Sequence, residues 1–137
     1  MELSEIAQKL YLDGYNCCEC VLHSLKENNV INVPDVVIRC ATGFRAGVAG
    51  SGCICGVITG GIIAIGLKYG RIDKKEDKEE ADRRTKIFYD KFREKFKSTC
   101  CRILTKDWKD NFNSQERKNY CAGIVAQMIT ELQELLK

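Results

Sequence analysis

The segment Ser51–Gly70, SGCICGVITGGIIAIGLKYG, decides the fold, because so apolar a stretch must lie either in a membrane or inside the protein. Residues 46–67 contain no charged side chain, which is the length of a membrane span. Their first third is a glycine-rich turn, however, and the roughly sixteen residues of helix that remain are fewer than the ~20 that cross a bilayer. We therefore expect no membrane insertion but a buried central helix from about Ile54 to Tyr69, closed by Gly70.

Glycines recur on neighbouring turns of this helix, at Gly56, Gly60 and Gly61. Each costs about 1 kcal/mol relative to alanine in a helix interior. We expect this cost to be offset by close approach of a neighbouring helix backbone, or of a group held by Cys55. The preceding GVAGSG, residues 47–52, is not a phosphate-binding loop, because it lacks the Lys-Ser/Thr pair and no strand precedes it.

Helical periodicity dominates the rest of the chain, and no alternating strand pattern with hairpin turns is present. Asn16 and Glu19 have the spacing of a capping box at a helix start, and so do Asp73 and Glu76 before a long charged helix. Pro34 suits the first position of another helix. Besides 54–69, the expected helices are 3–11, 17–26, 36–42, 74–97 and 115–136, with a short turn or helix at 98–104.

Length and charge limit the classes of fold and function. A chain of 137 residues suits one domain, 1–137, and the expected elements predict an all-α fold, an irregular bundle of about five to seven helices. With 22 basic and 19 acidic residues the net charge is +3, too small and too interleaved to indicate a nucleic acid as partner. The first residues include acids at positions 2 and 5 and no apolar secretory segment, so the expected location is cytoplasmic.

Nine cysteines are the anomaly in the composition. In a reducing compartment cysteine clusters more often bind metals or act in catalysis than form disulfides. An odd number also excludes complete pairing within the chain. The alternative is that the cysteines only fill the core, since a free cysteine behaves as a small, often buried hydrophobe. This structural interpretation is the preferred one for Cys18 and Cys40.

Most of the cysteines lie at predicted helix starts, where unpaired N–H groups and the helix dipole favour thiolate over thiol. Such positions can lower a cysteine pKa from ~8.5 to as little as ~3.5. We therefore expect reactive thiolates there. Cys17 and Cys20 also form a C-x-x-C motif, although the βαβ context of thioredoxin-like motifs is absent. The helix-start cysteines are Cys17, Cys18, Cys53, Cys55, Cys100 and Cys101, and Cys121 lies in the second turn of the last helix.

Four blocks carry a family resemblance: GYNCCECVL (14–22), GSGCICGVITGGIIAIGLKYGR (50–71), STCCRILT (98–105) and YCAGIVAQM (120–128). In order and content they resemble the C_GCAxxG_C_C family, whose members are inferred to be redox-active. The family motif reads Cys55-Gly56-Val57-Ile58-Thr59-Gly60 in this chain, with Val57 in place of the usual alanine.

The resemblance implies a site made of four cysteines. One of them is either Cys100 or Cys101, and we prefer Cys101, because CRILT resembles the family's Cys-Arg-x-Leu segment. The implied site cysteines are Cys17, Cys55, Cys101 and Cys121. The remaining cysteines are then additions of this sequence.

The leading hypothesis is a redox or electron-transfer protein, in which separate helices direct the four cysteines toward one partly buried site. The thiols would either cycle between dithiol and disulfide or bind an iron–sulfur cluster or zinc, since four thiolates suit both. Gly56 and Gly60 would leave room for such a cofactor. A thiol-dependent oxidoreductase activity is compatible with either chemistry.

Rival hypotheses come from other classes of protein. One is a zinc-stabilised interaction module, and another is a helical module whose buried cysteines are purely structural. A redox partner protein is expected but not identified by any motif. A homodimer through the glycine-rich helix or the last helix is an alternative to a monomer, because surfaces of close approach also suit subunits.

Overall fold

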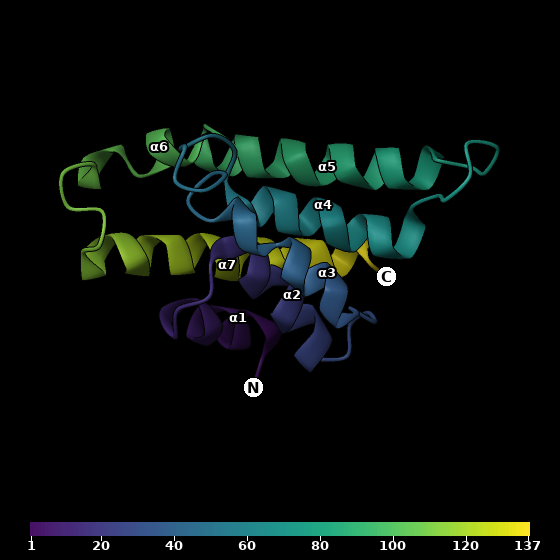
Figure 1. Ribbon diagram of the computed structural model, residues 1–137, viewed down its shortest axis with the longest axis horizontal. Coiled ribbons are helices and arrows are strands. Elements are labelled where there is room, and N and C mark those ends of the chain that lie inside the picture. The colour runs from purple at the N-terminus through teal and green to yellow at the C-terminus, as the bar shows by residue number, and fades with distance from the viewer.

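The computed structural model describes residues 1–137 and is all-α, as expected (Figure 1). Seven α-helices and two short 3₁₀ turns follow one another without a strand. The elements are α1 (Leu3–Leu12), α2 (Cys17–Glu27), α3 (Asp35–Cys40), η1 (Thr42–Phe44), α4 (Gly56–Tyr69), α5 (Glu79–Phe96), α6 (Cys101–Leu104), η2 (Lys106–Trp108) and α7 (Gln115–Leu135).

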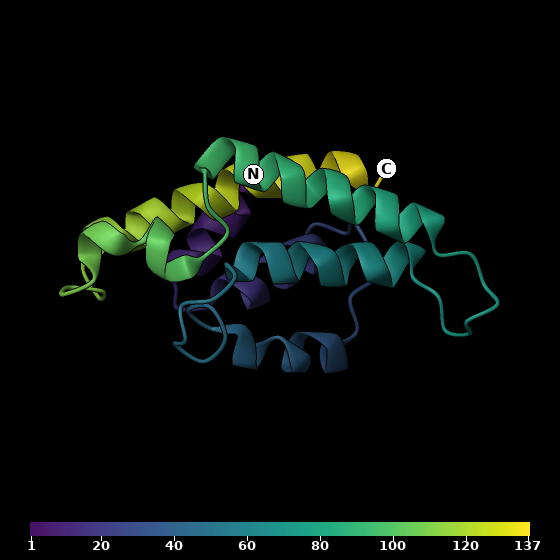
Figure 2. The ribbon, with the colours of Figure 1, turned by 90° about the horizontal axis from the view of Figure 1, so that it is seen from above.

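Helix α4 is the centre of the bundle. It contacts α2, α5 and α7, while α1 packs against α2 and α7. Figures 1 and 2 show α4 lying along α5, with α7 running beside them from the left-hand end of the molecule. The core is a single cluster of 23 buried residues, to which α4 contributes Val57, Ile58, Ala64 and Ile65.

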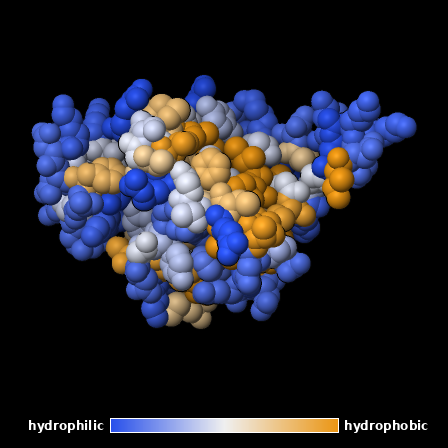
Figure 3. All heavy atoms as spheres, in the orientation of Figure 1, coloured by the Kyte–Doolittle hydropathy of each residue, from blue (hydrophilic) through white to orange (hydrophobic).

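Apolar residues are also exposed on one face of the molecule. On the face of Figure 3 the apolar residues gather near the middle, and hydrophilic residues cover both ends. None of the helices has the length and apolar character needed to cross a bilayer. The expectation of a buried central helix, against a membrane span, is therefore met by α4.

The glycines of α4 allow close helix packing, as the sequence predicts. A Cβ added at Gly60 would lie 3.0 Å from the Val21 Cβ of α2, and one at Gly61 would lie 2.2 Å from the Phe88 Cε2 of α5. A contact of 2.2 Å does not occur between real carbon atoms, so Gly61 admits no side chain unless Phe88 moves. Glycine at these positions thus brings α2 and α5 onto α4.

Several helix boundaries differ from the predicted ones. Helix α5 begins at Glu79 and not near residue 74, although Glu76 Oε1 does accept from the Asp73 amide at 3.0 Å. That bond closes a turn before the helix. Pro34 is the N-cap of α3 and not its first residue, and α3 ends at Cys40.

The turn before α4 has a backbone that the sequence did not predict. Five consecutive residues, 46–50, have positive φ, between 47° and 81°, and only two of them are glycine. The left-handed region costs an L-residue roughly 1–2 kcal/mol. Gly47 is required there, because an added Cβ would lie 2.4 Å from the Cys53 carbonyl oxygen. Hydrogen bonds from Gly52 N to Ala46 O and from Cys53 N to Gly47 O, both 3.1 Å, hold the turn closed.

Candidate functional site

One cavity of about 400 Å³ is lined by all four cysteines that the family resemblance implies. Cys17 is the first residue of α2, Cys55 is the N-cap of α4, Cys101 begins α6, and Cys121 lies in α7. These residues are up to 104 positions apart in the chain (121 minus 17). The bundle therefore gathers the thiols around a common space.

Two backbone hydrogen bonds tie the segment before α4 to the segment before α6. Cys55 N donates to Thr99 O at 2.8 Å, and Arg102 N donates to Gly52 O at 3.1 Å. Gly52 has φ +75°, and an added Cβ would lie 2.8 Å from the Arg102 Cβ. This pairing places Cys55 beside α6 and hence beside Cys101.

For Cys17 and Cys55, the largest influence on the pKa of each thiol is the hydrogen bond to the other. A hydrogen bond from Cys17 lowers the pKa of Cys55, and the backbone N–H groups of Val57 and Ile58 act in the same direction against burial. The same hydrogen bond, followed by burial, raises the pKa of Cys17 well above its ordinary value. Of the two thiols, Cys55 is therefore the one that loses its proton first as the pH rises.

Gly56 is what lets these two residues meet. A Cβ added at Gly56 would lie 3.0 Å from both the Cys17 Cβ and the Cys18 amide nitrogen. Gly56 also lines the cavity. Gly60, one turn further, is not among the lining residues and packs against α2 instead.

The expectation of lowered pKa values at helix-start thiols fails for Cys17 and Cys101, two of the three site cysteines expected there, and holds for Cys55. Burial raises the pKa of Cys101 to about 11. Burial also raises the pKa of Cys121, although Arg117 and Tyr11 pull it down. The physical reason is that desolvation of a thiolate outweighs the helix dipole. Helix α6 has only four residues, and Cys121 lies beyond the free N–H groups of the first turn.

Arg117 and Tyr11 also line the cavity, and the sequence did not indicate either. The Arg117 side chain is buried; its Nε donates to Phe112 O at 2.6 Å, and its Nη1 donates to the Tyr11 hydroxyl. Its guanidinium lies 4.1 Å from the Phe112 ring centroid. One signal was available, because Arg117 precedes Cys121 by four residues and thus shares its helix face. Tyr11 belongs to the apolar stripe of the first helix, so its place in the sequence did not indicate a polar role for its hydroxyl.

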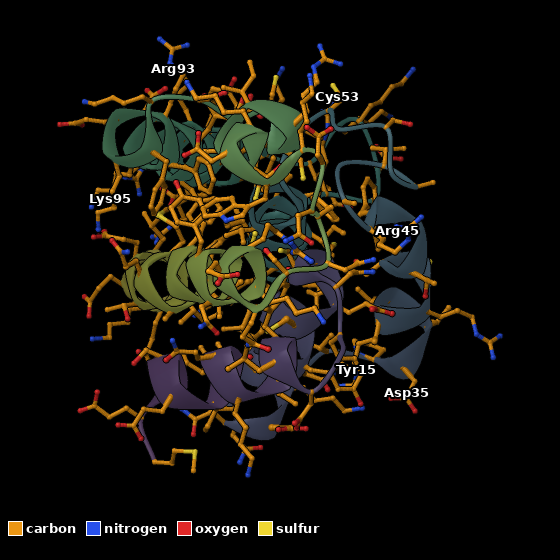
Figure 4. The ribbon with its side chains drawn as sticks, turned by 90° about the vertical axis from the view of Figure 1, so that its left-hand side faces the viewer. Tyr15, Asp35, Arg45, Cys53, Arg93 and Lys95 are labelled. Carbon is orange, nitrogen blue, oxygen red and sulfur yellow. The ribbon has the colours of Figure 1, made fainter.

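The other cysteines lie outside the cavity. Cys18 is fully buried, as expected, whereas Cys40 is exposed, contrary to its interpretation as a packing residue. Cys20 is buried too, and its thiol donates to Ala7 O at 2.9 Å. The C-x-x-C pair therefore has only one member, Cys17, in the cavity. Cys53 is exposed and does not lie in the first turn of α4, and Figure 4 shows it at the edge of the molecule.

All nine cysteines are free thiols. No three histidine, cysteine, aspartate or glutamate side chains are arranged closely enough to hold a metal ion. The four thiols thus line a shared cavity and do not form a preformed tetrahedral metal site.

Comparisons with curated proteins and with solved structures found no match. The model of the family described as "Putative redox-active protein (C_GCAxxG_C_C)" matches residues 15–135 of the 137. The match includes the four cysteines that line the cavity. The chain therefore belongs to the C_GCAxxG_C_C family.

Proposed function

We propose that this protein is a thiol redox protein in which Cys55 attacks a substrate disulfide and Cys17 resolves the product. The observation that carries the proposal is that Cys17 and Cys55 line one cavity, with Gly56 allowing the start of α4 to approach Cys17. Cys55 has its pKa lowered by Cys17 and by the start of α4, whereas Cys17 has its pKa raised. A nucleophile must be a thiolate, and the resolving thiol must be close by.

The reaction is a two-electron exchange. The Cys55 thiolate attacks one sulfur of the substrate disulfide, and the other half of the substrate leaves as a thiolate. Cys17 then gives up its proton to that thiolate or to water, and its sulfur attacks Cys55. The second half of the substrate leaves, so the substrate is reduced to two thiols while the protein forms a Cys17–Cys55 disulfide. In the reverse direction the protein oxidises a dithiol.

The cavity suits this sequence of steps because it shields the thiolate from bulk water. Cys55 is only 6% exposed, and Cys101 and Cys121 line the same space with their protons retained. These two thiols would act as a second pair that passes electrons to or from the first. A substrate disulfide would have to enter the cavity to exchange with these thiols.

A metal or cluster site is the second candidate, and its support is that all four cysteines line one cavity. An iron–sulfur cluster would supply one-electron transfer, and zinc would supply only stability. Cys17, Cys55, Cys101 and Cys121 would be the ligands. The thiols would have to approach one another to ligate a common ion, because they are not arranged as a metal site in this structure.

Peptide mapping after controlled oxidation tests the dithiol proposal. The reduced protein is treated with hydroxyethyl disulfide, the free thiols are alkylated, and disulfide-linked peptides are identified by mass spectrometry. We expect a Cys17–Cys55 link to dominate and Cys55 to be alkylated fastest before oxidation. A Cys40→Ala variant is the control for reactions at an exposed thiol. Uniformly slow alkylation and no Cys17–Cys55 link would leave the purely structural interpretation.

Anaerobic purification tests the second candidate. Metal analysis and a visible spectrum are recorded on the wild type and on Cys121→Ala. Iron with visible absorption that is lost in the variant would select a cluster, and stoichiometric zinc would select a structural site. Neither metal would leave the dithiol chemistry.

A further inference from the structure

We propose that the cavity binds a low-molecular-weight thiol or disulfide that carries carboxylates, whose negative charge is met by Arg117 and Arg45. This inference rests on the proposed function, because it names the class of substrate that reaches Cys55. It comes from the charges that line the cavity and from the depth of the thiols.

The lining of the cavity has three cations and one acid, whereas the 22 basic and 19 acidic residues of the whole chain are nearly balanced. Arg45, Arg117 and Lys118 line it, and none of the three takes part in an ion pair. Glu19 is the only acid in the lining. Its two oxygens already accept from the Asn16 amide at 3.0 Å and from the Thr42 hydroxyl at 3.4 Å.

Arg117 provides the strongest support for an anionic ligand. It is 7% exposed, yet its oxygen partners are neutral groups, the Phe112 carbonyl and the Tyr11 hydroxyl. Burying a cation without a counter-charge is costly. The Cys121 thiol also accepts from the guanidinium, and no carboxylate of the protein forms an ion pair with it. A buried guanidinium whose partners are all neutral suits the carboxylate of a ligand.

Arg45 is exposed and can meet a second carboxylate at the mouth. It lies one residue before the left-handed turn, and its guanidinium nitrogen would be 3.5 Å from a Cβ added at Gly50. Figure 4 shows Arg45 between Tyr15 and Cys53 in that view, on the opposite side from Arg93 and Lys95. Two cations at different depths fit a ligand with more than one carboxylate.

Size and depth favour a small substrate over a protein disulfide. A volume of about 400 Å³ is within the range of small-molecule pockets, ~300–1,000 Å³. Cys55 is 6% exposed, so a disulfide on the surface of a folded protein would not reach it without rearrangement. A flexible small disulfide can enter the cavity.

The test compares three disulfides of similar length and different charge: dithiodipropionate, with two carboxylates, neutral hydroxyethyl disulfide, and cystamine, with two ammonium groups. The second-order rate of oxidation of the reduced protein is measured at pH 7 with each. We expect dithiodipropionate to react about tenfold faster than cystamine, because the positive lining concentrates anions. The ratio of the dithiodipropionate rate to the cystamine rate should fall at high salt, because salt screens the charges at the mouth of the cavity.

Variants at two positions in the cavity lining and one control assign the effect to the cavity. Arg45→Gln is at an exposed position and should reduce the ratio severalfold without affecting folding, while Arg117→Lys, which keeps the charge, should preserve more of it than Arg117→Gln. Arg93→Gln removes the same charge from α5, on the opposite side in Figure 4, and should leave the ratio unchanged.

The outcomes separate the two proposals. If all three disulfides oxidise the Cys17–Cys55 pair at equal rates in the wild type, the carboxylate inference is wrong and the thiol redox function stands. If the ratio is large but equal in Arg45→Gln, Arg117→Gln and Arg93→Gln, the charges named here are not its cause and the inference is again wrong. If none of the disulfides oxidises the pair, the proposed function fails and the inference fails with it.

Discussion

At the scale of single residues, the chemistry of the cavity depends on which sulfur carries the charge. Cys55 caps α4 and receives the Cys17 hydrogen bond, so its pKa is lowered despite burial. Cys17, the first residue of α2, has its pKa raised. The pKa values of the two thiols are thus shifted in opposite directions, and this difference separates the proposed nucleophile from the proposed resolving thiol.

Replacing Cys17 tests whether its thiol lowers the pKa of Cys55. In Cys17→Ala the donor to Cys55 is lost, so the pKa of Cys55 should rise and its alkylation at neutral pH should slow severalfold. In Cys17→Ser a hydroxyl can still donate, so the change should be smaller. The measurement is the pH dependence of alkylation at the Cys55 peptide, resolved by mass spectrometry, with Cys40→Ala as control. Identical curves for wild type and Cys17→Ala would show that Cys17 does not tune Cys55.

At the scale of elements, the site depends on how closely two helices approach α4. The start of α2 lies against Gly56, and α5 lies against Gly61. Replacing these glycines would separate the helices and move Cys17 away from Cys55. The left-handed turn at 46–50 and its bonds to the α6 segment then position Cys55 from the other side.

A pair of glycine substitutions in one helix separates close packing from helix propensity. Gly61→Ala places a Cβ against Phe88 and should lower the free energy of unfolding by roughly 1–3 kcal/mol, as overpacking does. Gly66→Ala, also in α4, meets nothing within 4 Å and should raise it by up to ~1 kcal/mol through helix propensity. Urea denaturation measures both. Equal effects of the same sign would contradict the packing role of Gly61.

At the scale of the whole molecule, the bundle buries thiols as neutral groups, which makes its stability depend on pH. Burial raises the pKa of Cys18 to about 11 and of Cys20 to about 12, and both are 0% exposed. Unfolded cysteines ionise near ~8.5. Above that pH the unfolded chain releases protons that the folded chain keeps, so high pH favours unfolding.

We expect the free energy of unfolding to fall as pH rises from about 8.5 toward 11, by up to ~1.4 kcal/mol per pH unit for each such thiol. Cys55 has the opposite sign; its contribution is lost only as pH falls through its lowered pKa and is constant in this window. The free energy of unfolding is measured by urea denaturation at pH 8, 9 and 10, and it should fall less steeply with pH in Cys20→Ala than in the wild type. An equal fall with pH in the variant and the wild type would contradict the burial of Cys20 as a neutral thiol.

Local features of the chain were enough for most of the fold. The Asn16–Glu19 capping box is present as predicted, with bonds of 2.9 and 3.0 Å, and α7 begins at the expected Gln115. Caps and helix periodicity act over a few residues, so they can be recognised in sequence. The Asp73–Glu76 pair shows the limit of such signals, because the same spacing closes a turn without starting a helix.

The sequence by itself determined the all-α bundle, the buried central helix, the glycine contacts of α4 and, through the family resemblance, the four cysteines of interest. Only the tertiary structure decided which of those thiols has its pKa lowered and which cations share their cavity. A pKa depends on desolvation and on partners distant in the chain, as Cys17 is from Cys55. Arg117 likewise acquires its role from Tyr11, 106 positions away, because burial and long-range contacts exist only once the helices have packed.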